Sequence, residues 1–167
     1  MGKQTTTNAN IVDIDLSVIR KKRFRIDGDD NRILELNTSD LNILPRLKET
    51  YPKLMELNNQ VAELSAKASE TTDGVGLENG EFDSVIDTLA QVDTSMRELI
   101  DYIFDSNVSE ICAPSGSMYD PINGQCRFEH IIACLTNLYE TDMSAELDKL
   151  AKRTDKYTSK YTKRKKS

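Results

Sequence analysis

The sequence predicts a mainly α-helical protein of the α+β class, with a small β-hairpin near the N-terminus and three main helices. Apolar residues recur every three or four positions through much of the chain after residue 40, which is the period of amphipathic helices. Near the N-terminus, apolar and polar residues instead alternate on either side of an Asp/Gly/Asn cluster, as they do in a hairpin. The chain has 167 residues, the length of one ordinary domain, which we place at residues 11–151.

The predicted strands belong to the N-terminal part of the chain. Residues 1–10 are polar and show no period, so we expect them to be disordered. Residues 11–19 alternate apolar and polar positions for most of their length and suggest an extended segment. We expect the hairpin at about residues 21–37, KKRFRIDGDDNRILELN, where two strand-like runs flank the turn cluster.

The first predicted helix contains two prolines. Residues 37–40, Asn-Thr-Ser-Asp, have side chains that accept hydrogen bonds from the free amides of a first helical turn. An apolar stripe follows from residue 41 to residue 64. Pro45 and Pro52 lie inside it, and each removes an amide donor and crowds the preceding turn. We therefore expect a short first helix, a restart near Pro45 and a kink at Pro52.

Two further helices are predicted, each preceded by a loop. Residues 70–81 hold three glycines and indicate a flexible loop, and residues 82–104 follow the helical period closely. Residues 105–125 contain many turn-forming residues and suggest a long irregular loop. The third helix is expected from about residue 127 to residue 153, and residues 152–167 are expected to form a basic, flexible tail.

Charge is distributed unevenly along the chain. The net charge is −6, but residues 152–167 hold eight basic residues and one acid, which gives this tail +7 and the remainder −13. Such an asymmetry bears on partners rather than on fold. No run approaches the ~20 apolar residues that a membrane-spanning helix needs, so we expect no membrane segment.

The sequence predicts neither catalysis nor a cofactor. His130 is the only histidine, and there is no Ser-centred elbow, phosphate loop or HExxH motif. The three cysteines are an odd number, which favours free thiols in a reducing, cytoplasmic compartment. A zinc site could draw on Cys112, Cys126, His130 and Cys134, three of which are spaced i, i+4, i+8. Since the paired CxxC spacing of zinc sites is absent, we favour core packing for these residues and predict no metal.

The basic tail supplies the candidate partner-binding residues, namely Lys156, Tyr157, Lys160, Tyr161, Lys163 and Arg164. One reading is a nucleic-acid arm, in which the cations meet phosphates and the tyrosines stack on bases. The acidic remainder of the chain would repel a polyanion and disfavours this reading. The tail could also solubilise the protein, or meet an acidic protein surface, including that of another copy, which would make a homo-oligomer.

Three stretches resemble the tail assembly chaperones of long-tailed phages and prophages of Gram-positive bacteria. They are FRIDGDDNRILELNTSDLNILPRLKETYPKL (24–54), MRELIDYIFDSNVSEICAP (96–114) and GSMYDPINGQCRFEHIIACL (116–135). The resemblance covers roughly residues 20–140. It carries no signature residue onto Cys112, Cys126 or Cys134.

The resemblance implies a non-enzymatic helper in the host cytoplasm. Such a chaperone coats the tape-measure protein, keeps it soluble, helps to recruit tail-tube subunits and is absent from the finished tail. An alternative is a structural virion protein, such as a head–tail connector or a minor tail protein. A second alternative is a nucleic-acid-binding accessory protein that acts through residues 152–167.

Overall fold

The computed structural model describes residues 10–19, 21–72 and 79–164, and it confirms the predicted fold class. The described chain is mainly helical, with a two-stranded antiparallel hairpin near its N-terminus. The predicted disorder of residues 1–10 falls almost wholly outside the described residues, and residues 10–16 adopt no regular element. In chain order the elements are η1 (Ser17–Ile19), β1 (Lys22–Ile26), β2 (Asp29–Leu36), α1 (Ile43–Thr72), α2 (Asn79–Phe104), α3 (Val108–Cys112), β3 (Pro121–Ile122), β4 (Gln125–Cys126) and α4 (Arg127–Arg164).

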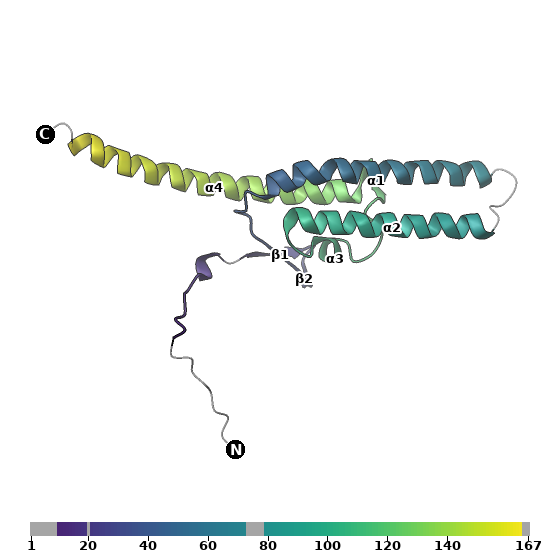
Figure 1. Ribbon diagram of the computed structural model, residues 1–167, viewed down its shortest axis with the longest axis horizontal. Coiled ribbons are helices and arrows are strands. Elements are labelled where there is room, and N and C mark those ends of the chain that lie inside the picture. Colours follow the sequence, from purple (N-terminus) through teal and green to yellow (C-terminus); the bar gives the residue numbers. More distant parts are fainter. Residues whose placement is uncertain (1–9, 20, 73–78, 165–167) are drawn as a thin grey trace, which may run out of the picture.

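The three long helices run side by side for only part of their length (Figure 1). α1 and α2 form an antiparallel pair, and the first half of α4 lies against both. The tip of the α1–α2 pair extends beyond α4 at one end of the molecule, and the second half of α4 extends beyond the other helices at the opposite end. The core lies in the middle, where the three helices overlap and the β1–β2 hairpin and α3 cover α2.

The β1–β2 hairpin turns at an Asp-Gly pair. Asp27 and Gly28 both have positive φ, of 52° and 72°, which suits a tight two-residue turn because it matches the right-handed twist of the strands. Sequence reasoning placed the turn at residues 28–31, but β2 already begins at Asp29. Leu34 and Leu36 are fully buried on one face of β2 and attach the hairpin to the core.

α1 begins later than expected and continues through both prolines. The short helix expected before Pro45 is absent, because residues 41 and 42 form a turn and the helix starts at Ile43. Pro45 therefore lies in the first turn, where its missing N–H would have had no helical partner. Pro52 lies within an uninterrupted helix.

The connection between α1 and α2 is shorter than the predicted loop. α1 reaches Thr72 and α2 begins at Asn79, so both helices extend into the predicted 70–81 loop, and residues 73–78 lie outside the described residues. The helix predicted at residues 82–104 is confirmed as α2, with three more residues at its start.

Residues 105–125 are not the irregular loop that the sequence suggested. They contain α3 and the β3–β4 hairpin, whose turn is Asn123-Gly124 with φ of 50° and 81°. Arg97 of α2 holds this segment: its guanidinium donates to the carbonyls of Ser109, Ala113 and Gly116 at 2.7–3.2 Å. The contacts are distant in sequence, so the local pattern gave no sign of them.

α4 extends well past its expected end. The third helix was predicted to stop near Arg153, but α4 continues to Arg164, which corrects the expectation of a flexible tail from residue 152. Lys and Arg are good helix formers, and basic residues near a helix C-terminus complement its dipole, whereas the Thr, Tyr and Ser residues of the same segment favour a helix less. A Lys149–Glu146 ion pair of 2.8 Å spans one turn.

Candidate partner-binding groove

An open apolar groove lies between the N-terminal half of α1 and the middle of α4. Its volume is about 610 Å³. α1 contributes Ile43, Leu44, Leu47, Lys48, Tyr51 and Pro52, and α4 contributes Ile132, Thr136, Tyr139, Glu140 and Met143. Leu44 is 60% exposed, so the groove leaves a leucine side chain largely in water. We call this feature the α1–α4 groove.

Tyr139 joins the groove to the core. Its side chain is 3% exposed, and its ring packs on Phe104 of α2 with a centroid separation of 5.9 Å and a tilt of 45°. Burial raises the pKa of the Tyr139 hydroxyl to about 12, and nearby Asp40 adds to this shift. The hydroxyl is therefore neutral at physiological pH.

The start of α1 is held by a partly buried ion pair. Arg46 contacts Asp40 at 2.7 Å, with side-chain exposures of 17% and 18%, and also donates to the carbonyl of Ile103 on α2 at 2.9 Å. Partial burial opposes ionisation of Asp40, but hydrogen bonds from Arg46 and the amide of Asn42 outweigh it and lower the pKa of the carboxyl. This network fixes the first turn of α1, and with it the wall of the groove that carries Leu44 and Leu47.

Asp142 attaches the β1–β2 hairpin to α4 just beyond the groove. Its carboxylate accepts hydrogen bonds from Nζ of Lys22 at 2.6 Å and from the hydroxyl of Thr38. The Lys22 contact, followed by the Thr38 hydrogen bond, lowers the pKa of Asp142. A second hollow of about 470 Å³ lies beside this contact and is lined in part by Val18, Leu36 and Glu146.

The apolar face of α4 continues past the groove onto residues 144–164, which we call the α4 extension. All described side chains from residue 144 to residue 156 are exposed. Leu147 and Leu150 are 55% and 58% exposed. On a helix that turns about 100° per residue, both lie within about 40° of Met143, so they continue the groove's own face.

The six predicted partner-binding residues all lie on the α4 extension, which brings them onto one helix. The side chain of Lys156 is exposed. For Tyr157, Lys160, Tyr161, Lys163 and Arg164, the structure describes the helical backbone alone.

The four candidate metal ligands have other surroundings. His130 Nε2 lies 2.7 Å from the carbonyl oxygen of Ile122, and the thiol of Cys126 donates to Oδ1 of Asn58 at 3.3 Å. Cys134 is exposed, and burial raises the pKa of the half-buried Cys112 thiol to about 11. Within the described ranges, no group of three or more His, Cys, Asp or Glu side chains is placed to hold a metal ion.

The sequence pattern did not predict the groove. The stripe from residue 41 to residue 64 indicates one apolar face of a helix, yet the first turns of α1 leave one apolar edge in water. A usable signal was the adjacent pair Ile43 and Leu44, because neighbouring positions on a helix point about 100° apart and the core buries only one of them. Leu41, like Leu44, is more than half exposed.

The comparisons with known proteins give no family. No protein-family model, no curated protein and no solved structure matches this chain. Over the residues that the structure covers, none of the helices has both the length and the apolar composition needed to cross a membrane. The function must therefore be argued from the groove and the α4 extension.

Proposed function

We propose that this protein is a non-catalytic tail assembly chaperone that holds an amphipathic helix of a phage tape-measure protein in the α1–α4 groove. On this proposal it acts in the host cytoplasm, keeps the tape-measure protein soluble, helps to recruit tail-tube subunits and is absent from the finished particle. The observation that carries the proposal is the open apolar groove itself, with Leu44 60% exposed at its edge.

The chemistry of the groove suits a helical client. Two parallel walls of apolar side chains are a common way to receive the apolar stripe of a third helix. Lys48 and Glu140 also line the groove, one on each helix, and provide one charge of each sign to orient a partner. Each leucine-sized client side chain that becomes fully buried contributes about 1.5–3 kcal/mol, so a few such contacts support reversible binding.

The resemblance and the groove involve the same parts of the chain. Residues 24–54 include the whole α1 wall of the groove, and residues 116–135 include the start of the α4 wall. A holding role requires an apolar surface and a solubilising charge but no reacting groups. The acidic character of the chain outside residues 152–167 supplies that charge.

Co-expression with a phage tape-measure protein tests the proposal. We expect the partner to stay soluble and to co-purify with the wild-type chain. Leu44→Glu places a charge in the groove and should return the partner to the insoluble fraction. Ile86→Glu is the matched control, because Ile86 is 46% exposed on α2 and does not line the groove.

Three results would count against the chaperone. A partner that is equally insoluble with and without the wild-type chain removes the basis for a holding role. Finding the protein in purified particles by mass spectrometry favours the structural virion alternative instead. Binding to DNA at physiological salt that is lost on deletion of residues 152–167 favours the nucleic-acid alternative.

A further inference from the structure

The α4 extension is an amphipathic helix with nothing on its apolar face among the described residues. Leu147 and Leu150 are each more than half exposed, although they lie on the face that is buried or groove-lining earlier in the helix. A helical segment of about 20 residues is marginally stable in water unless its apolar face is covered. We therefore expect a partner to cover this face of the α4 extension.

The sequence places two tyrosines further along α4. Tyr157 follows Leu150 at a spacing of seven residues, and Tyr161 follows Tyr157 at a spacing of four. On a helix of about 3.6 residues per turn, these positions share the face of Met143 to within about 40°.

Charge along this part of α4 is divided between its two halves. Before Lys149, the acidic residues are Glu140, Asp142, Glu146 and Asp148. From residue 149 to residue 164, Asp155 is the one acid, and the basic residues are Lys149, Lys152, Arg153, Lys156, Lys160, Lys163 and Arg164. When two copies of this segment run in opposite directions, the acidic half of each therefore lies beside the basic half of the other.

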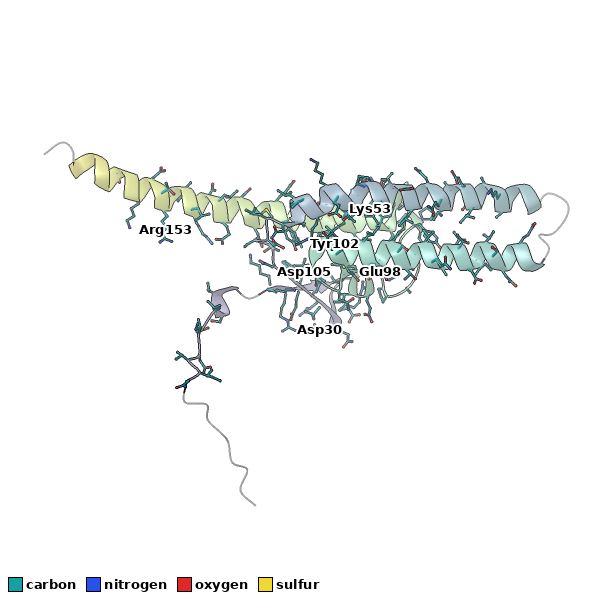
Figure 2. The ribbon with its side chains drawn as sticks, viewed as in Figure 1. Asp30, Lys53, Glu98, Tyr102, Asp105 and Arg153 are labelled. Atoms are coloured by element: carbon teal, nitrogen blue, oxygen red, sulfur yellow. The ribbon has the colours of Figure 1, made fainter. Side chains whose placement is uncertain are left out.

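We propose that two copies of this chain associate through an antiparallel, two-fold pairing of their α4 extensions. Leu147 of one copy packs on Leu150 of the other, and the reverse contact follows from the symmetry. Glu146 and Arg153 lie on the same flank of the apolar face, about 60–80° from Met143. In an antiparallel pair the same flanks of the two helices meet. Arg153 of one copy (labelled in Figure 2) then lies two residues, about 3 Å, along the helix from the position opposite Glu146 of the other copy, a distance that its side chain can span. Glu146 pairs with Lys149 in its own chain at 2.8 Å, so the contact adds a second cation to this carboxylate.

This register also involves the α1–α4 groove. When Leu147 faces Leu150, position 157 of one copy lies opposite Tyr139 or Glu140 of the other, and position 161 lies opposite Thr136. All three facing residues line the groove. In this register the helical backbone at the end of each α4 reaches the groove of its partner.

The distribution of charge favours a second copy of the chain as the occupant of the groove, and an antiparallel direction of pairing. A parallel pair would place the basic end of one α4 beside the basic end of the other, which is unfavourable. A nucleic acid would meet the cations but leave Leu147 and Leu150 in water. Self-association and client binding use the same groove, so by mass action each opposes the other.

Sedimentation of the purified full chain without any client tests the dimer, so its result is independent of the proposed function. We expect a concentration-dependent dimer for the wild type and a monomer for the double variant Leu147→Glu/Leu150→Glu. A wild type that stays monomeric up to its solubility limit overturns the proposal, as does a double variant that dimerises like the wild type.

Charge exchange tests the direction of pairing. Glu146→Arg and Arg153→Glu should each weaken self-association by about tenfold or more, because each places like charges at both symmetric contacts. Mixing the two variants restores opposite charges at both contacts, so heterodimers should form. The double variant Glu146→Arg/Arg153→Glu should dimerise as the wild type does, since every contact is exchanged.

Matched controls separate these contacts from general charge effects. Glu98→Arg and Lys53→Glu make the same changes of charge at exposed positions on α2 and α1 (Figure 2) and should leave the dimer unchanged. A mixture of the Glu146 and Arg153 variants that remains monomeric, while the wild type dimerises, rules out the antiparallel register. If the control variants lose dimerisation to the same extent, this also contradicts the antiparallel register.

Discussion

Asp142 on α4 accepts a 2.6 Å hydrogen bond from the ammonium of Lys22 on β1, across 120 residues of sequence. The same carboxylate oxygen accepts the hydroxyl of Thr38, which is 2% exposed. One carboxylate therefore joins the β1–β2 hairpin and the residues before α1 to the point where α4 leaves the bundle. It links the groove wall on α1 to the groove wall on α4.

Asp142→Asn should weaken this link. The amide keeps the shape but loses the charge that pairs with Lys22, and a partly exposed pair of this kind contributes about 1 kcal/mol. Urea unfolding followed by circular dichroism measures the loss. Glu140→Gln is the control, because this neighbouring carboxylate is exposed, and its variant should unfold at the wild-type concentration of urea.

The same carboxylate gives stability a dependence on acid. The pKa of Asp142 is lower in the folded protein than its ordinary value of 3.8. Its contribution is therefore complete above that value and is lost as the pH falls through the folded pKa. The difference in unfolding free energy between wild type and Asp142→Asn should shrink as the pH falls below 4; a difference that stays constant there contradicts this role.

Arg97 should be a major determinant of stability. Its guanidinium pairs with Asp93 at 2.7 Å and donates to three carbonyls between residues 109 and 116. Arg97→Met leaves Asp93 without its cation and the carbonyls without a donor, which should lower the free energy of unfolding by about 2–4 kcal/mol. Arg97→Lys should have an unfolding free energy between those of the wild type and Arg97→Met, because an ammonium group cannot reproduce the several donors of a guanidinium.

Exposed arginines provide the comparison. Arg23 pairs with Glu35 at 3.5 Å on the hairpin, with both side chains more than half exposed. Arg23→Met should change the unfolding free energy by less than about 0.5 kcal/mol. If Arg97→Met costs no more than Arg23→Met in the same urea titration, the carbonyl contacts do not hold residues 105–125.

The cysteines should differ in their rates of alkylation. Cys134 is exposed, whereas burial raises the pKa of the Cys112 thiol to about 11. The thiolate is the reactive form, so Cys112 has little of it at pH 8. Iodoacetamide at this pH, followed by peptide mass spectrometry, should label Cys134 first and Cys112 at a rate close to that of local opening. Equal labelling of the two in the folded protein would contradict the burial of Cys112.

The sequence predicts the long elements well and the short ones poorly. The stripe at residues 82–104 and the alternation at 21–37 are local patterns, and α2 and the β1–β2 hairpin follow them. α3 and the β3–β4 hairpin are too short to show a period; they depend on contacts from Arg97 and on Asp101, which accepts hydrogen bonds from Ser109. Asn123-Gly124 was recognised as a turn, but not as a hairpin between two-residue strands.

For a related reason, the sequence predicted only part of the candidate site. Charge placed the predicted partner-binding residues at 156–164, and the structure brings them onto one helix. Leu44 and Leu147 belong to stripes that look like core faces, and only the packing of the bundle decides which part of a stripe is covered. The sequence did not predict the last turns of α4, because their composition is polar and helix propensity without a buried face is a weak signal.

The two prolines of α1 should respond oppositely to replacement by alanine. Pro45 lies in the first turn, where no helical hydrogen bond is lost, so Pro45→Ala mainly increases the freedom of the unfolded chain and should lower stability by about 0.4–1 kcal/mol. Pro52 lies within the helix, where the ring removes one hydrogen bond and crowds the preceding turn. Pro52→Ala should raise the free energy of unfolding by about 1–2 kcal/mol, since the helical gain exceeds the same entropic loss.

Pro52 also lines the α1–α4 groove, so its replacement separates stability from binding. Urea titrations of both variants with equal m-values would show that the changes lie in the folded helix rather than in the compactness of the unfolded state. A Pro52→Ala variant that is more stable than the wild type but binds its partner less well would mean that the proline helps to keep the groove open. If both replacements shift the midpoint in the same direction, the placement of α1 relative to its prolines is wrong.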